Sequence, residues 1–498
     1  PSPTSAAPSP SGPSSASTAS AQADPEGTWV QVENRRAGTT AWRIPDGAVA
    51  TDSQLAGWSD RTSVTPGETF GLHVSSHVGA FTVTAYRLGW YGGAGGREVW
   101  QSSPVPGRPG AAPAMARGRM VVTRWPTSLG VPTQGWPEGT YLMVLRAAGR
   151  ARYVPVTVRS SDTTGRLVLV NAVSTWQAYN AWGGYSLYHG PGGASANRSL
   201  RVSYDRPYDG NGAQSLLNFE QAAIRAAERQ GLDLAYLTSW DLDRDGAVLT
   251  GARGLVSLGH DEYWSPRMRA AVERARDLGT NLAFLGANAA YWRVRFEGGG
   301  RVLAGYKDAA LDPVRWSRAT TVHWREQPDP DPENSLTGML YECYPATGAL
   351  VVRTPGFFLF RGTGVSAGTR VPGLAGTEVD RAYPIAGTPA NLQVVAHSPV
   401  RCGPLRRTWS DMTYYTTPSG AGVVSTGTML WVRALRGPDA SHGITAQGVA
   451  FVRTVTDTLL AAMAAGPMGL TDPSVPNLAG LHASPWTSTG TGAPYSLP

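Results

Sequence analysis

Short apolar runs alternate with helix-like segments between residues 165 and 288, and this alternation restricts the possible folds more than any other feature of the sequence. The runs are RLVLVNA (166–172), LDLAYLT (232–238), RGLVSLG (253–259) and TNLAFLGAN (280–288). Each has the length and composition of a strand buried on both faces. Helical spacing occurs at 213–231 and 265–279, the second with Ser265 as N-cap, Pro266 next and Gly279 at its end. Strands alternating with helices predict βαβ units and a parallel sheet.

We therefore predict an α/β domain over residues 165–466. From about residue 297 its sequence is looser and rich in Gly and Pro, which we interpret as insertions and short strands before a last strand and helix. Residues 27–160 instead contain seven or so short β-type runs, beginning with TWVQVEN, and predict an immunoglobulin-like β-sandwich. Residues 1–26 are predicted to be a disordered Ser/Pro/Ala-rich linker, and residues 467–498 a Pro/Gly-rich arm.

The charge of the chain does not indicate a nucleic-acid partner. The 498 residues carry a net charge of +7 and a pI near 9.5, but the arginines are scattered and Lys307 is the only lysine. Nucleic-acid-binding proteins usually gather basic residues on one face or helix, so we expect no such partner. No apolar run reaches about 18 residues, so we also expect no transmembrane segment.

The N-terminal tract and the two cysteines predict a protein outside the cytoplasm. A polar Ser/Pro/Ala tract is typical of what remains after removal of a signal peptide or of a lipoprotein anchor. In an oxidising compartment Cys343 and Cys402 are expected to form a disulfide. Closing a loop of that length stabilises a fold by about 4 kcal/mol on the chain-entropy model. We therefore expect a secreted or extracytoplasmic protein.

Polar and aromatic side chains follow three of the predicted strands, where open parallel sheets bind their ligands. They are Tyr179, Asn180, Tyr185 and Tyr188 after the first run, His260, Asp261 and Glu262 after the third, and Asn288, Tyr291 and Trp292 after the fourth. The sequence has no GxGxxG, GxxxxGK[ST] or HExxH motif, so neither a nucleotide-phosphate site nor a His-rich zinc site is indicated. Carboxylate, phenol, imidazole and amide groups favour a hard cation such as ferric iron, manganese or calcium.

Six motifs in this order resemble the large subunit of N,N-dimethylformamidase and its relatives. They are TWQAYNAWGG, SYDRPY, LGHDEYWS, FLGANAAYWRVRF, GTEVDRAYP and DMTYYTTPSGAGVVSTGTMLW, and they cover roughly residues 165–465. The resemblance implies an α/β domain similar to the class I glutamine amidotransferase fold, and the preceding sandwich fits the family's layout. It also implies a mononuclear iron, held by two tyrosinates and one glutamate, that hydrolyses a small amide.

The resemblance assigns the metal ligands residue by residue. Glu262 matches the iron-binding glutamate of the His-Asp-Glu motif. Tyr179, in the Trp-x-Ala-Tyr-Asn motif, is the first predicted tyrosinate. Tyr208 is predicted as the second, with Tyr188 and Tyr185 as alternatives.

The resemblance also implies catalytic roles. His260 matches a histidine that handles protons, and Asn288 matches a site asparagine that would donate to the oxyanion. Glu378 matches a second acidic residue of the site. Asp261 is expected to support the loop, although each of these polar residues could also serve structure alone.

Two functions follow from these observations. The first is an exported metallohydrolase that acts on an amide or related C–N bond of a small or cell-envelope-derived substrate. The alternative is a non-catalytic or carbohydrate-binding extracellular protein that keeps the family fold. A homo-oligomer is possible in either case, and the sequence does not reveal whether a small partner subunit exists.

Overall fold

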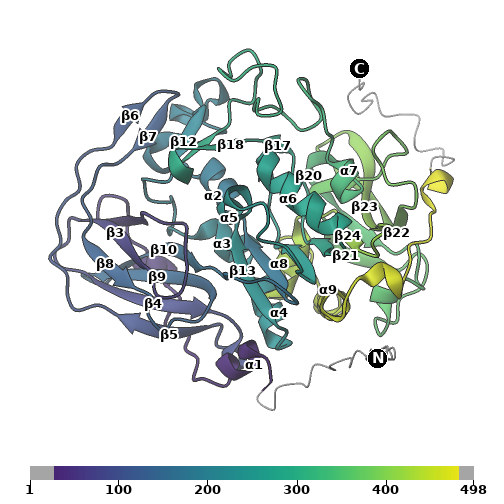
Figure 1. The fold of residues 1–498 in the computed structure, drawn as a ribbon, viewed down its shortest axis with the longest axis horizontal. Helices are drawn as coiled ribbons and strands as arrows, with labels where there is room; N and C mark the ends of the chain where they lie inside the picture. Colours follow the sequence, from purple (N-terminus) through teal and green to yellow (C-terminus); the bar gives the residue numbers. More distant parts are fainter. Residues whose placement is uncertain (1–26, 482–498) are drawn as a thin grey trace, which may run out of the picture.

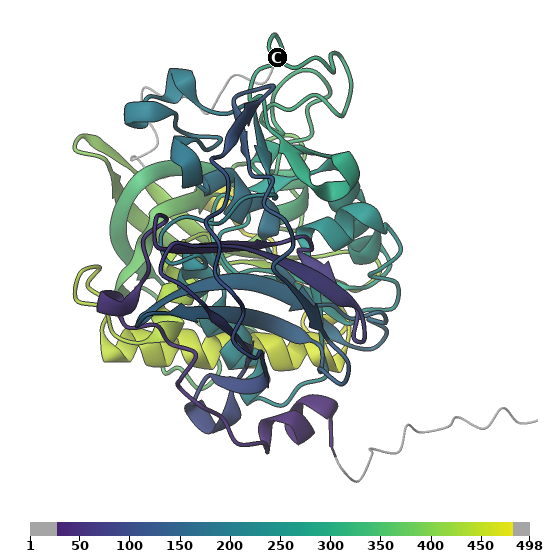
Figure 2. The same ribbon diagram turned by 90° about the vertical axis from the view of Figure 1, so that its left-hand side faces the viewer.

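The computed structural model describes residues 27–481 of the chain. The linker predicted at 1–26 and the part of the predicted arm from 482 to 498 lie outside the described residues. The described chain forms a β-rich region up to about residue 160 and a mixed α/β region after it (Figure 1). Figure 2, turned by 90°, looks onto the strands of the β-rich region.

Two sheets of the β-rich region enclose one apolar core. Their strand orders are β1-β3-β8 and β2-β10-β9-β4-β5. The bounds are Leu55–Ser59 (β1), Ser63–Val64 (β2), Thr69–Ser76 (β3), Thr82–Leu88 (β4), Gly96–Gln101 (β5), Leu129–Pro132 (β8), Gly139–Ala147 (β9) and Arg150–Val158 (β10). A separate hairpin consists of β6 (Ala114–Ala116) and β7 (Met120–Val122). The immunoglobulin-like topology of this region stays a prediction.

The segment TWVQVEN, predicted as a strand, is helical. Trp29–Asn34 form α1, and the Thr28 hydroxyl accepts a hydrogen bond from the Gln31 backbone N–H at 3.2 Å. The Gln31 side chain accepts one from the Thr28 N–H at 3.3 Å, which completes a capping box. The prediction was wrong because this capping, with the packing of α1 on α4 (Gln221–Arg229), outweighs the alternating apolar pattern.

The α/β region is built on a nine-stranded sheet of order β13-β11-β14-β16-β24-β23-β22-β20-β21. Its first five strands pair in parallel, and four of them are apolar runs identified in the sequence. Their bounds are Leu167–Asn171 (β11), Leu234–Thr238 (β13), Gly254–Ser257 (β14), Asn281–Phe284 (β16) and Gly422–Ser425 (β24). Every residue of these strands is buried, because helices cover both faces. Similarity to the class I glutamine amidotransferase fold stays a prediction.

Four long antiparallel strands extend the sheet where the sequence predicted insertions and short strands. They are Leu340–Val351 (β20), Arg370–Arg381 (β21), Gln393–Cys402 (β22) and Arg406–Thr416 (β23). The pairing of β20 with β21 shifts its register in three places, and Pro345, Gly348 and Pro372 lie inside these two strands. Because bulges, prolines and glycines interrupt a period of two, the sequence alone does not show strands of this length.

Helices and short strands complete the α/β region. The helices are Val173–Tyr179 (α2), Gln214–Phe219 (α3), α4, Ser239–Arg244 (α5), Pro266–Asp277 (α6), Asn334–Thr337 (α7), Leu430–Arg436 (α8) and Ala446–Ala465 (α9). The short strands are Arg201–Ser203 (β12), Tyr263–Trp264 (β15), Trp292–Arg293 (β17), Arg295–Glu297 (β18) and Val302–Ala304 (β19). Single 3₁₀ turns of the whole described chain lie at Asp46–Ala48, Tyr91–Gly93, Trp182–Gly184, Pro191–Gly193, Ser195–Asn197, Gly298–Gly300, Phe358–Phe360, Met468–Leu470 and Leu478–Leu481.

The predicted cap of α6 is confirmed, since the Ser265 hydroxyl accepts a hydrogen bond from the Met268 N–H at 3.1 Å.

Helix α9 has the length and composition that could cross a membrane, with a mean hydropathy of 1.3 over its apolar window. Half of that window is buried against the rest of the protein. The helix also carries Asp457, which pairs with Arg229 of α4. In the structure α9 therefore packs as a core helix beside the sheet.

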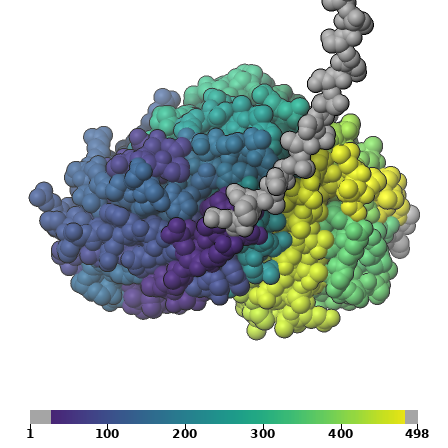
Figure 3. Space-filling view, turned by 60° about the horizontal axis from the view of Figure 1, so that its bottom comes forward, coloured from purple at the N-terminus to yellow at the C-terminus, as the bar shows by residue number. Residues whose placement is uncertain are grey.

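A buried ion pair joins the β-rich region to the α/β region. Arg87 of β4 and Glu228 of α4 are fully buried and form a salt bridge through two hydrogen bonds. Arg87 also donates to the Tyr91 hydroxyl at 2.8 Å, and the Tyr236 hydroxyl donates to Glu228 at 2.5 Å. Apolar side chains from both regions share one buried cluster. The space-filling view shows the two regions as one continuous body (Figure 3).

The predicted disulfide is confirmed, and it allows a test of stability. Cys343 of β20 is bonded to Cys402 of β22, 59 residues later. Replacing both residues by alanine should lower the free energy of unfolding by about 4 kcal/mol, because the unfolded chain regains the entropy of an open loop. Urea denaturation under non-reducing conditions measures this change. The reduced natural protein should match the double variant, and equal unfolding midpoints with and without the bond would contradict the expectation.

Candidate functional site

The carboxyl ends of neighbouring parallel strands supply the centre of the site. Strand β11 runs into α2, which ends at Tyr179, and β14 is followed by the loop that carries His260 and Glu262. Strand β16 is followed by Asn288, and Glu378 comes from β21. Because parallel strands end at one edge of a sheet, these side chains meet there. All six residues predicted for the site, Tyr208 included, line the same cavity.

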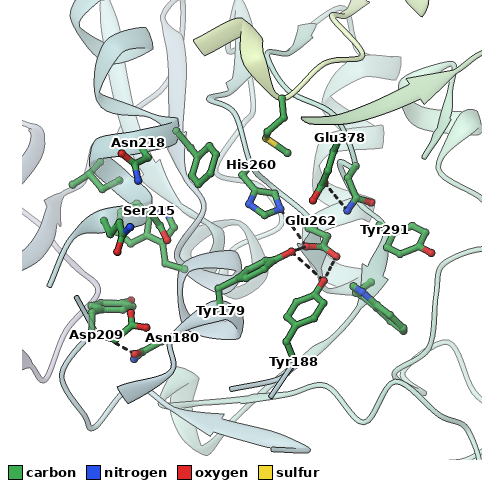
Figure 4. Close-up of a pocket in the computed structure, with 18 of the residues that line it drawn as sticks. Tyr179, Asn180, Tyr188, Asp209, Ser215, Asn218, His260, Glu262, Tyr291 and Glu378 are labelled. Atoms are coloured by element: carbon green, nitrogen blue, oxygen red, sulfur yellow. Dashed lines mark hydrogen bonds and ion pairs between the residues drawn. The ribbon is translucent and has the colours of Figure 1, made fainter. Parts of the chain in front are cut away.

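The cavity has a volume of about 840 Å³ and lies at the sheet edge beside α2 and α3. Figure 4 shows Glu262 near its centre, with Tyr179, Tyr188 and His260 directed toward the carboxylate. Other residues of its wall are Trp176, Asn180, His189, Tyr208, Asp209, Gln214, Ser215, Asn218, Phe219, Tyr291, Trp292, His323, Tyr341, Tyr344, Thr377 and Met429. The wall therefore combines aromatic rings with many hydrogen-bonding groups.

The Glu262 carboxylate is the most connected group of the site. It is only 1% exposed, and it accepts a hydrogen bond from the Tyr179 hydroxyl at 2.6 Å on one oxygen and from the Tyr188 hydroxyl on the other. The two hydroxyls lie 3.1 Å apart, and their rings stack with centroids 4.5 Å apart. The His260 Nε2 lies 3.2 Å from the oxygen that accepts from Tyr179. Two phenol oxygens and one carboxylate thus converge at a single point.

A backbone hydrogen bond places the two tyrosines side by side. The Leu187 N–H donates to the Ala178 carbonyl at 2.9 Å, and each of these residues is followed directly by one of the tyrosines. Leu187 and Ala178 are both fully buried, which anchors the loop to the end of α2. The loop that contains Tyr188 is therefore held against the end of the helix that carries Tyr179.

The charges around Glu262 favour its ionised form. Burial alone would raise the pKa of the Glu262 carboxyl, but the hydrogen bond and charge of His260, with Lys307 and Tyr179, hold it below its ordinary value. Burial alone would lower the pKa of His260, but its bond to Glu262 and the charge of Glu378 raise it above its ordinary value. Both shifts favour an ion pair between the imidazolium and the carboxylate.

The two phenols are held in their neutral form. Burial, followed by the charge of Glu262, raises the pKa of Tyr179 and of Tyr188 well above the usual value for a phenol. As neutral groups they donate to the carboxylate, which matches the hydrogen bonds observed. Only a strong positive charge beside their oxygens would convert them into phenolates.

Lys307 is a site residue to which the sequence analysis assigned no role. Its Nζ donates to the Tyr263 hydroxyl at 2.6 Å and lies 3.5 Å from the centre of the Tyr188 ring. Burial lowers the pKa of Lys307 to about 7, against the opposing charge of Glu262. The available signal was that Lys307 is the only lysine of the chain. Lys307 follows β19, which lies outside the nine-stranded sheet. A search of the residues that follow the parallel strands therefore did not include it.

Asn288 binds two further carboxylates, Glu378 and Asp380, and of these Glu378 lines the cavity. The Asn288 side-chain amide donates to Glu378 at 3.1 Å, and its backbone N–H donates to Asp380 at 2.8 Å. Asn288 has a φ of 61°, so its backbone lies in the left-handed region. Burial raises the pKa of Glu378 and raises the pKa of Asp380 to about 8. Asp380 thus fixes the turn, while Asn288 holds Glu378.

The structure separates Tyr208 from the proposed ligands. Tyr208 lines the cavity, but its ring packs against Trp176 at 6.3 Å, and among the described residues it has no hydrogen bond to Glu262. Tyr188, predicted as an alternative, occupies that position instead. Tyr185 packs beside the buried Trp182 cluster and is not part of the cavity wall. The residue order in the sequence could not distinguish these tyrosines, since all lie in the same Gly- and aromatic-rich loops.

Asp261 supports the loop, as the sequence suggested. Its carboxylate accepts from the Ser257 hydroxyl at 3.0 Å, and its carbonyl accepts from the Trp264 indole N–H at 2.9 Å. The next residue, Glu262, donates its N–H to the Thr175 hydroxyl of α2 at 3.0 Å. These bonds fix the loop between β14 and α6, so that Glu262 points into the cavity.

The fold and site define a class of protein: a mixed α/β protein with an oxygen-rich cavity at the carboxyl edge of its sheet. The chain belongs to the N,N-dimethylformamidase beta subunit-like family, because the sequence model of that family's C-terminal region matches residues 82–445. The name of the family indicates a hydrolase of amide bonds. The match begins in β4, so it includes most of the larger sheet of the β-rich region as well as the α/β region. No curated protein matches the chain.

The raised pKa of Asp380 predicts a pH-dependent cost to stability. Its folded-state pKa of about 8 lies above that of a free aspartate, so the folded protein keeps a proton that the unfolded chain loses above about pH 4. This carboxyl therefore costs nothing at low pH and destabilises the fold increasingly as the pH rises toward 8. In the variant Asp380→Asn, stability should fall less between pH 5 and pH 8, by on the order of 1 kcal/mol per pH unit.

Urea midpoints of both proteins at several pH values test this expectation. The contribution of Glu220, whose pKa burial also raises to about 8, cancels in this comparison, because that residue is present in both proteins. Parallel pH curves for the two proteins would contradict the shift.

Proposed function

We propose that this protein hydrolyses an amide or a related C–N bond at a mononuclear ferric site held by Tyr179, Tyr188 and Glu262. The observation that carries the proposal is the convergence of two phenol oxygens on one buried carboxylate, in a member of the dimethylformamidase-like family. The Tyr179 hydroxyl lies 2.6 Å from Glu262 and 3.1 Å from the Tyr188 hydroxyl, which also donates to Glu262. The family name supports amide hydrolysis, and the donor set supports the metal.

The residues of the site fit ferric iron better than the alternatives. In the described part of the chain, no group of three or more His, Cys, Asp and Glu side chains is placed to hold a metal ion. A cation here would therefore have to use phenol oxygens, which a trivalent ion can ionise. Two phenolates and one carboxylate carry three negative charges, equal to the charge of ferric iron. When bound, the metal would supply Lewis acidity toward the amide carbonyl.

The protein's own groups would handle the protons. His260 is placed beside Glu262, and a cation bound by that carboxylate would lower the pKa of the imidazole again. The neutral Nε2 could then accept the proton of an attacking water. Glu378 lines the same cavity, held by Asn288, and its raised pKa favours a protonated carboxyl that can donate to the leaving nitrogen. The oxyanion role predicted for Asn288 stays a prediction, because its side-chain NH₂ group has a second hydrogen besides the one donated to Glu378. The water oxygen would join the acyl carbon, the C–N bond would break, and the nitrogen would leave as an amine.

The proposal also includes the cellular location of the protein and its assembly with other chains. The disulfide between Cys343 and Cys402 supports a working place outside the cytoplasm, as for a secreted protein. The family's description as a beta subunit supports an enzyme of more than one chain. Self-association stays a prediction, which light scattering of the purified protein can examine.

Metal analysis of matched tyrosine variants tests the ligand assignment. The protein reconstituted with ferric iron should bind one ion per chain and show a visible tyrosinate charge-transfer band. Tyr179→Phe, Tyr188→Phe and Glu262→Gln should each lose more than half of the bound iron, because each removes one of only three ligands. Tyr208→Phe, in the same cavity, is the matched control and should retain both iron and colour.

Amine release from a panel of small amides tests the reaction itself. The iron-loaded protein should release amine, and Tyr188→Phe should reduce the rate in proportion to its lost iron. A colourless protein that binds no iron and hydrolyses no amide would reject the proposal. It would leave the alternative, a binding protein that keeps the family fold.

A further inference from the structure

The cavity is far larger than a small amide requires. Its volume of about 840 Å³ lies in the range of pockets that enclose drug-sized ligands. A molecule such as dimethylformamide has only a handful of non-hydrogen atoms and would leave most of this space to water. The part of the cavity beyond Glu262 therefore has room for the rest of a larger substrate.

One arm of the cavity carries polar groups that have no hydrogen-bond partner among the described residues. Among the described residues, the Ser215 hydroxyl has no partner, and neither does the amide nitrogen of Asn218. One oxygen of Asp209 accepts from the Ala181 N–H at 3.1 Å, and the other has no partner in the same set. Figure 4 shows these three side chains together on one side of Tyr179, away from Glu378. We call this group the polar arm.

The polar arm is held in place by neighbouring side chains. The oxygen of Asn180 accepts from the Asp209 backbone N–H at 3.0 Å, and Arg436 donates to the Asn218 side-chain oxygen at 3.0 Å. This second bond fixes the orientation of the amide, so that its nitrogen is the free end. The free groups are therefore positioned before any ligand arrives, as in a formed binding site.

The polar arm adjoins the reacting groups directly. Helix α3 carries both Ser215 and Asn218, and it ends at Phe219. The Phe219 ring lies 5.2 Å from the His260 ring, between centroids. A ligand that extends from Glu262 past His260 thus meets first an aromatic face and then the polar arm.

We propose that the substrate is an N-acylated amino sugar, with its amide at Glu262 and the hydroxyl groups of its ring in the polar arm. This inference rests on the proposed hydrolysis of an amide at the same site. Sugar hydroxyls both donate and accept, so they can satisfy the carboxylate of Asp209, the hydroxyl of Ser215 and the amide N–H of Asn218 together. The C–H face of the ring suits an aromatic neighbour such as Phe219.

A cationic substituent fits the polar arm less well. An ammonium group would pair with the Asp209 carboxylate, but it only donates, so the free N–H of Asn218 would face another donor. The guanidinium of Arg436 lies directly behind Asn218 and would repel a second cation. Neutral hydroxyl groups meet neither obstacle.

The reaction on such a substrate balances with water as the only co-reactant. The water oxygen bonds to the acyl carbon, and the bond from that carbon to the sugar nitrogen breaks. One proton of the water goes to the nitrogen. The products are a carboxylic acid and a free amino sugar.

The test compares an N-acetylated sugar ring with an N-acetylated hydrocarbon ring of the same ring size. N-acetylglucosamine and N-cyclohexylacetamide each carry an N-acetyl group on a six-membered ring, and the second lacks hydroxyl groups. The iron-loaded protein should show a higher kcat/KM for the sugar, measured by amine release. Ser215→Ala and Asn218→Ala should each reduce the ratio of the two kcat/KM values about tenfold, because each removes one hydrogen bond to a hydroxyl.

The exposed Ser103→Ala is the matched control, since Ser103 lies in the β-rich region outside the cavity, and it should leave the ratio unchanged. Thermal midpoints check that all variants are folded. Equal kcat/KM values for the two amides, or a ratio insensitive to both polar-arm variants, would overturn the inference while leaving amide hydrolysis in place.

Calorimetry separates this inference from the proposed function. If the protein hydrolyses no amide, binding of N-acetylglucosamine that exceeds binding of N-cyclohexylacetamide, and that weakens about tenfold in Asn218→Ala, would support the polar arm alone. Absence of both hydrolysis and binding of the sugar would overturn the inference together with the proposed function.

Discussion

The buried carboxylate of Glu262 is the constraint on which the rest of the site depends. An ionised group with 1% exposure costs several kcal/mol to bury unless positive charges and hydrogen bonds surround it. Tyr179 and Tyr188 donate to it, His260 pairs with it, and the charge of Lys307 acts on it. These groups come from α2, from the loop after it, from the loop after β14 and from the segment after β19. Compensating one charge therefore fixes four separate stretches of chain.

The β-rich region is tied to this scaffold by a second buried charge. Arg87 and Glu228 are both fully buried, and removing either would leave the other without compensation. Helix α4, which carries Glu228, directly follows α3, which carries part of the cavity wall. This continuity gives a physical reason for the family match to begin in β4 and not at the first strand of the parallel sheet. The larger sheet of the β-rich region is part of what positions the site.

The sequence predicted the parts of the fold that local pattern determines. Strands β11, β14 and β16 are buried on both faces, so they appear as continuous apolar runs, and α6 has a cap and a glycine stop. The antiparallel half was not recognised, because bulges in β20 and β21 break the period of two. Helix α1 was missed because its capping by Thr28 and its packing on α4 outweigh a strand-like pattern. Local patterns fail where contacts distant in sequence decide the structure.

The same distinction explains the site. Glu262, His260 and Asn288 follow parallel strands. They could be predicted because open parallel sheets bind their ligands at the carboxyl ends of the strands. The choice between Tyr188 and Tyr208 depends instead on one backbone hydrogen bond, from Leu187 to Ala178, which sets Tyr188 beside Tyr179. No residue pattern encodes that bond, since any buried aliphatic residue could make it. Which tyrosine of a loop reaches the carboxylate is therefore decided by the hydrogen bond that holds the loop in place. Here that bond joins the residues directly before the two tyrosines.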